Sequence, residues 1–197
     1  MKAWIAIFGL ALWSQTLTVQ KERALGEALL RDAKRFENAE VAAYVERVGA
    51  RLGGGFRVVV ITGDKGEPVA LPGQIVTVPA GFLLAVEDEA EFAGMLAHAM
   101  GHTALRHGIV EQPGTITLMT PIEHPPDRML SAIRMRLPEY ELAADRYGAE
   151  AAARAGYDAT GLTRYLRRTK AAEERLAELP AAEGGEVSSS EFLRVRE

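Results

Sequence analysis

The chain contains four histidines and no cysteine, so any metal or proton chemistry must rest on imidazoles and carboxylates. The lack of cysteine excludes disulfides, thiolate nucleophiles, iron–sulfur clusters and cysteine-ligated zinc. His98 and His102 stand four residues apart in a stretch that predicts a long helix over residues 87–107. Residues at this spacing share one helix face, with Cβ atoms about 5–6 Å apart, so both imidazoles can reach one ion. The pair is the starting point for a predicted metal site.

Two imidazoles do not complete a catalytic zinc site, which needs a third protein ligand, often a carboxylate, and a position for water. Glu141 lies 39 residues after His102 on a second predicted helix and offers such a carboxylate. Asp145 shares a face with Glu141, where it can accept an N–H from a ligating histidine and fix its tautomer. The same spacings also occur on solvated or packed helix surfaces, so on spacing alone the metal site is one of two interpretations.

The predicted secondary structure around these residues runs in the order helices, a small sheet, then helices. Apolar residues at helical spacing run over residues 22–52, with Asn38 as a candidate cap between two helices. β-branched residues predict strands at 56–62 and 74–78, separated by turn residues. Beyond the helix at 87–107, further helices are predicted at 126–136, 138–155 and 158–179. This order predicts an α+β domain, mostly helical, with a small β-sheet beside the helix that carries His98.

Length and charge bound the class of protein. A chain of 197 residues fits one globular domain, and its formal net charge of -4 excludes a strongly basic nucleic-acid binder. The excess of acidic over basic residues lies at the end of the chain, where residues 171–197 contain seven Glu and three Arg. We therefore expect a domain over residues 21–172, followed by an acidic, flexible tail over residues 173–197.

Residues 1–20 differ from the rest of the chain. Lys2 precedes an apolar run over residues 3–13, and no further charge occurs before Lys21. This is the composition of a secretory signal peptide, and the run is short for a membrane span of about 20 residues. We expect an exported protein, periplasmic or secreted. If the segment is not cleaved, it would act as a membrane anchor.

Several stretches in the order of the chain carry a family resemblance. They include the helix of His98 and His102, the preceding strand, and the segment of Glu141 and Asp145. The sequences are Ala-Leu-Pro-Gly at 70–73, Ile-Val-Thr-Val-Pro-Ala-Gly-Phe-Leu at 75–83, Glu-Asp-Glu-Ala-Glu-Phe-Ala-Gly-Met-Leu-Ala-His at 87–98, Gly-His-Thr-Ala-Leu-Arg-His at 101–107, Glu-Leu-Ala-Ala-Asp at 141–145, Gly148, and Ala-Gly-Tyr-Asp at 155–158. Over roughly residues 22–172 the chain resembles the HtpX and CAAX prenyl protease type of zinc metallopeptidases, peptidase family M48.

The resemblance implies a compact gluzincin domain and a hydrolase that cuts peptide or unfolded protein substrates. Zn²⁺ would be held by His98, His102 and Glu141, with Asp145 behind the ligands. The resemblance further implies that Ile75, Val76, Thr77 and Val78 form the sheet edge beside the cleft, where a peptide adds as a strand. Family members work on misfolded or envelope proteins, which implies a role in envelope protein quality control.

One residue departs from the family pattern. The family has Glu after the first histidine, as in H-E-x-x-H, and this chain has Ala99. That Glu takes a proton from the zinc-bound water, so its absence should lower turnover by about 10²–10⁴ while leaving zinc binding intact. Ala99 is either an engineered change that inactivates an endopeptidase or the mark of a natural pseudoenzyme.

Four further side chains are candidates near the site. His107 matches a family position but is expected to cover the helix end rather than bind zinc. His124 opens a His-Pro-Pro sequence in an unusual place for the family and is a candidate extra ligand or oxyanion group, or else a surface histidine. Tyr140 and Tyr147 flank Glu141 and are candidate oxyanion donors, or else packing residues.

Three functional hypotheses follow. The first is an exported zinc metalloendopeptidase lacking its general base. The second is a zinc-binding pseudoprotease that binds extended peptides without cutting them, in the manner of a chaperone. The third is a helical envelope scaffold without metal, which requires the arrangement of His98, His102 and Glu141 to be accidental.

Overall fold

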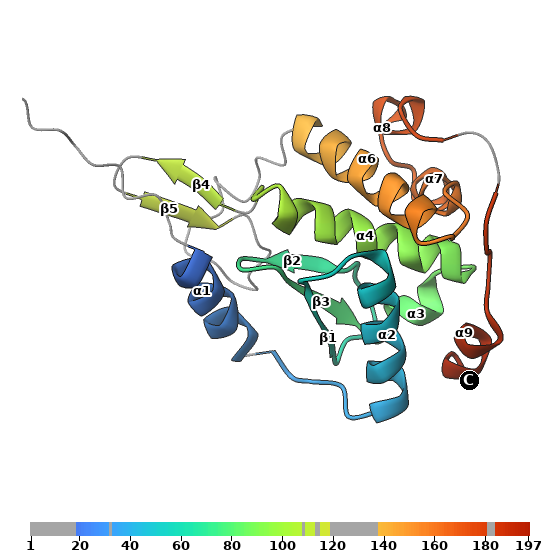
Figure 1. The fold of residues 1–197 in the computed structure, drawn as a ribbon, viewed down its shortest axis with the longest axis horizontal. Coiled ribbons are helices and arrows are strands. Elements are labelled where there is room, and N and C mark those ends of the chain that lie inside the picture. The colour runs from blue at the N-terminus through green and yellow to red at the C-terminus, as the bar shows by residue number, and fades with distance from the viewer. Residues whose placement is uncertain (1–18, 32, 108, 113–114, 119–137, 181–183) are drawn as a thin grey trace, which may run out of the picture.

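The computed structural model describes residues 19–31, 33–107, 109–112, 115–118, 138–180 and 184–197. The chain forms a mostly helical α+β fold with a small mixed sheet, as the sequence predicts (Figure 1). The elements are α1 (Val19–Arg31), α2 (Ala39–Leu52), β1 (Arg57–Ile61), β2 (Val69–Leu71), β3 (Ile75–Pro79), α3 (Phe82–Ala85), α4 (Glu89–Ala104), β4 (Ile109–Gln112), β5 (Thr115–Leu118), α6 (Pro138–Arg154), α7 (Gly161–Arg168), α8 (Glu173–Ala177) and α9 (Ser190–Val195).

Helix α4 is the centre of the fold. It lies between the three-stranded sheet and the helices α6 and α7 (Figure 1). Its residues Phe92, Leu96 and Met100 are fully buried in the main core, which explains why the helix is apolar on more than one face. Asp88 caps its first turn, where the carboxylate accepts a hydrogen bond from the Glu91 amide at 2.8 Å. A helix enclosed in this way holds its side chains in fixed positions.

The sheet has the strand order β1-β3-β2, which corrects one prediction. Strand β3 pairs with β1 in parallel and with β2 antiparallel, and all five of its residues are buried. Ile75, Val76, Thr77 and Val78 therefore form the central strand and not the sheet edge. Strand β2 was missed because it has only three residues and follows a turn-rich segment.

The region after α6 also differs from its prediction. One helix was expected over residues 158–179, but α7 ends at Arg168 and α8 begins at Glu173. Lys170 adopts a left-handed conformation with φ 58°, and the amide of Ala171 donates to the carbonyl of Leu166 at 2.9 Å. This is the hydrogen bonding of a Schellman helix end. The break lets α8 pack against α6.

The described end of the chain, residues 184–197, is packed on the domain, whereas the sequence predicted a flexible tail. Phe192 of α9 is 0% exposed and belongs to the main core. The amide of Ser189 donates to the buried carboxylate of Glu89 at 2.6 Å. Burial of the apolar Phe192 ring stabilises the packed position of this segment, even though the residues around Phe192 are largely polar or charged.

Two predicted segments fall largely or wholly outside the described residues. Residues 1–18 of the predicted leader and the predicted helix at 126–136 belong to this group. Within the part of the chain that the structure describes, none of the helices has the length and apolar character needed to cross a membrane.

Candidate metal centre

His98 and His102 project from one face of α4, one turn apart. Their Nε2 atoms lie 3.0 Å from each other. The side chain of His98 is 8% exposed, and that of His102 is 20% exposed. The predicted pair therefore presents two adjacent nitrogens at a partly open position.

Helix α6 brings Glu141 to the same point. Its carboxylate oxygens lie 3.5 Å from Nε2 of His102 and 3.8 Å from Nε2 of His98. The close approach of α6 to α4 depends on Gly148, because a Cβ there would stand 2.9 Å from the backbone nitrogen of His98. A glycine in the third turn of α6 thus sets the distance between the two helices.

Asp145 contacts His98 at the ring nitrogen that does not face Glu141. One of its oxygens lies 2.8 Å from Nδ1 of His98, which leaves Nε2 of His98 directed at Glu141 and His102. Asp145 is 1% exposed. A carboxylate oxygen this close to Nδ1 favours the tautomer in which His98 ligates through Nε2, and this role of Asp145 stays a prediction.

Arg175 of α8 completes this group and was not predicted. Its Nε and Nη2 donate to the two oxygens of Asp145 at 2.7 and 2.8 Å, and its Nη1 lies 3.2 Å from a Glu141 oxygen. Burial alone would raise the pKa of Asp145, but the hydrogen bonds from Arg175 and His98 outweigh burial and hold that pKa below its ordinary value. Asp145 is therefore a carboxylate at neutral pH.

His107 and Tyr140 form a second support beside His102. Nδ1 of His107 lies 3.2 Å from Nδ1 of His102, and the ring of Tyr140 stacks on His107 with centroids 4.3 Å apart. Burial lowers the pKa of His107. His107 thus lies at the end of α4, as expected, but it also contacts a predicted ligand.

The remaining predicted residues have mixed outcomes. Ala99 is 1% exposed and packs in the main core with no group that accepts a proton. The ring of Tyr147 packs beside Gly101 of α4, so both tyrosines make packing contacts, and their role as oxyanion donors stays a prediction. His124 lies outside the described residues.

The donor set fits a zinc ion. Zinc in a tetrahedral site binds nitrogen and oxygen at about 2.0–2.2 Å, which separates neighbouring ligand atoms by about 3.4 Å. The donor atoms of His98, His102 and Glu141 all lie within 4.8 Å of one another. Among the described residues this is the one such group of three. Two imidazoles and a carboxylate are the ligands of catalytic zinc sites that keep one position open.

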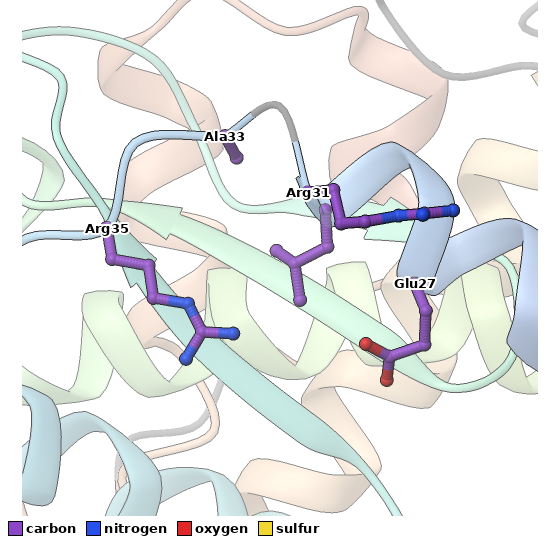
Figure 2. Close-up of a pocket in the computed structure, with 5 residues that line it drawn as sticks. Glu27, Arg31, Ala33 and Arg35 are labelled. Atoms are coloured by element: carbon purple, nitrogen blue, oxygen red, sulfur yellow. The ribbon is translucent and has the colours of Figure 1, made fainter.

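A pocket elsewhere on the molecule does not join this centre. It has a volume of about 210 Å³ and is formed by the end of α1 and the segment that follows (Figure 2). Glu27, Leu30, Arg31, Ala33 and Arg35 line it. It contains no histidine and no nucleophile, and Glu27 is already paired with Arg57.

One comparison with known proteins covers the part of the site that contains His98 and His102, but not Glu141. The family model of Peptidase family M48 matches residues 34–122, which contain the sheet, α4 and both histidines. Glu141, Asp145 and Arg175 lie beyond the matched range, so their place in the site rests on the structure. No match was found among curated proteins.

Proposed function

We propose that the chain is a zinc metalloendopeptidase of the HtpX and CAAX prenyl protease type, because the model of Peptidase family M48 matches residues 34–122. The observation that carries the proposal is the convergence of His98, His102 and Glu141 from two helices, with donor atoms within 4.8 Å. A protein substrate follows from the peptidase family. The third hypothesis, a scaffold without metal, gives no reason for this convergence.

The residues around the metal centre have different roles. Zinc held by His98, His102 and Glu141 would supply Lewis-acid chemistry, polarising the scissile carbonyl and lowering the pKa of bound water toward about 7. Asp145 holds the ring of His98, and Arg175 holds Asp145. Arg175 also offsets the negative charge that Glu141 and Asp145 bring together below the surface.

Ala99 sets the activity of this chain. By the family resemblance it occupies the position of the general-base Glu, and a methyl group cannot accept a proton. Loss of a general base costs about 10²–10⁴ in rate. We therefore propose that the chain as given is a zinc-binding form with little turnover. An engineered Glu-to-Ala change accounts for the retention of all the other site residues.

Strand β2 is the edge on which an extended peptide would bind. Among the described residues it pairs only with β3, and it packs against α4. The hydroxyl of Thr103 donates to the Leu71 carbonyl at 2.9 Å, which ties the end of β2 to α4 one residue after His102. A peptide pairing with β2 would therefore run close to the metal centre.

A second candidate function is peptide binding without cleavage. Ala99 favours it, because a natural protein with intact ligands and no base would keep a zinc-stabilised peptide groove. In either case the apolar run before residue 19 supports export, with a place in envelope protein quality control, or membrane association if that run is retained.

The Ala99→Glu variant separates these functions. With an unfolded protein as substrate, the endopeptidase predicts that Ala99→Glu raises cleavage by about 10²–10⁴ and that a chelator abolishes the gain. Ala99→Gln is the matched control, since it has the same size and no basic carboxylate. Peptide binding by Ala99→Glu without hydrolysis would instead favour the pseudoprotease.

A further inference from the structure

The C-terminal end of α4 places a third histidine against the metal centre. Arg106 adopts a left-handed conformation with φ 58°. The amide of His107 donates to the carbonyl of His102 at 2.9 Å, and the amide of Arg106 donates to that of Thr103 at 3.2 Å. These two bonds define a Schellman motif, in which the side chain after the left-handed residue packs on the residue five positions earlier. Here the residues that meet are His107 and His102.

This contact is polar where a Schellman motif usually has an apolar one. At the end of α7 the same motif brings Ala171 near Leu166. At the end of α4, Nδ1 of His107 lies 3.2 Å from Nδ1 of His102, with the rings inclined at 75°. Two neutral imidazoles at this distance form a hydrogen bond only when one nitrogen carries the proton and the other accepts it.

The direction of that bond follows from the other face of His102. Its Nε2 lies 3.0 Å from Nε2 of His98 and 3.5 Å from Glu141, so Nε2 is the nitrogen directed at the metal centre. A histidine that ligates through Nε2 has its proton on Nδ1. The proton of His102 therefore faces Nδ1 of His107, which must accept it.

Two contacts hold His107 in place. The ring of Tyr140 lies parallel to that of His107, with an interplanar angle of 6°. Arg106, the left-handed residue before His107, forms an ion pair with Glu22 of α1. Because Tyr140 immediately precedes Glu141, the same helix that supplies the carboxylate also holds His107.

We propose that His107 is a positioning residue for the metal centre, which accepts the Nδ1 proton of His102 and thereby directs Nε2 of His102 at the ion. It does for His102 what Asp145 does for His98. This inference rests on the proposed function, since it requires that His102 bind a metal.

Zinc affinity measured by competition with a chromophoric chelator tests the proposal. His107→Phe keeps a ring to stack on Tyr140 but removes the acceptor, and we expect about 10–100-fold weaker zinc binding. His107→Asn places an amide oxygen in the acceptor position, and we expect an affinity within about threefold of the parent chain. Thermal unfolding of the metal-free variants checks that each is folded.

Each result has one meaning. Equal affinity of His107→Phe and the parent chain would overturn the positioning role, and so would an Asn variant as weak as the Phe variant. A parent chain that binds no zinc would instead overturn the proposed function, and this inference with it. In the zinc-loaded parent, ¹⁵N NMR should show a proton on Nδ1 of His102 and a coupling from it to Nδ1 of His107. A proton on Nε2 of His102 would contradict the proposal.

Discussion

Arg175 holds both oxygens of Asp145, and Asp145 in turn lies 2.8 Å from the ring of His98. The arginine comes from α8 and the carboxylate from α6, 30 residues earlier. The pair lies beneath the metal centre, with side chains 18% and 1% exposed. The orientation of His98 therefore depends on a helix that lies outside the region matched by the peptidase family.

Removal of Arg175 should weaken both stability and metal binding. Arg175→Ala leaves the buried Asp145 carboxylate without its main partner, and breaking a buried ion pair costs about 3–5 kcal/mol. We expect a loss near the lower end, because Arg175 is partly exposed. Urea unfolding of the metal-free protein measures it.

Arg175→Lys is the matched control for that experiment. It keeps the charge but cannot make two parallel hydrogen bonds, so it should recover only part of the stability and of the zinc affinity. Full recovery by Lys would show that the charge matters and the paired geometry does not.

Gly148 should tolerate no side chain. In Gly148→Ala the new Cβ would meet the backbone of His98 at 2.9 Å and force α6 away from α4. Overpacking of this kind costs about 1–3 kcal/mol, and the displaced Glu141 should bind zinc more weakly. Gly184→Ala, where a Cβ meets nothing within 4 Å, should leave unfolding and zinc affinity unchanged. An unaltered Gly148→Ala variant would contradict the observed helix packing.

Asp158 should make the fold sensitive to acid. Burial raises its pKa, but hydrogen bonds from Thr160 and Arg164 outweigh burial, so the pKa in the folded state lies below the ordinary value. The stabilisation is complete above the unfolded-state pKa of about 3.9 and is lost as the pH falls through the folded-state pKa. Asp158→Asn removes this dependence.

The free energy of unfolding measured between pH 3 and pH 7 checks the role of Asp158. The variant should be less stable than the parent at pH 7 and should lose less stability on acidification. Glu150→Gln, at a side chain 70% exposed, is the control and should follow the parent curve. Parallel curves for Asp158→Asn and the parent would refute the assignment.

The end of the chain should contribute to folding. Phe192→Ala removes a fully buried ring and should cost about 3–5 kcal/mol in denaturant unfolding. Its neighbour Leu193 is 56% exposed, so Leu193→Ala should cost little. If both variants unfold like the parent chain, α9 does not belong to the core.

Local patterns predicted the residues that lie on one face of one helix. The i,i+4 spacings of His98 with His102 and of Glu141 with Asp145 predicted two facing groups, and the structure brings them together. Arg175 was missed because its place depends on a helix break at Lys170, where no glycine or proline signals the end of α7.

The sheet and the chain end show a second reason for failure. Strand β3 is a five-residue apolar run, and such a run does not reveal whether one or both of its edges are paired. Phe192 lies in a charged, polar sequence, so composition alone favoured a flexible tail. Both depend on contacts between distant parts of the chain.

Zinc content tests most directly whether His98, His102 and Glu141 form one metal centre. Chelator-stripped protein, reloaded with zinc and dialysed, should hold one zinc per chain by elemental analysis. His98→Ala and Glu141→Ala should each hold much less, while Glu150→Ala, at a side chain of α6 that is 70% exposed, should hold one. A parent chain without zinc, or ligand variants that retain it, would contradict the assignment.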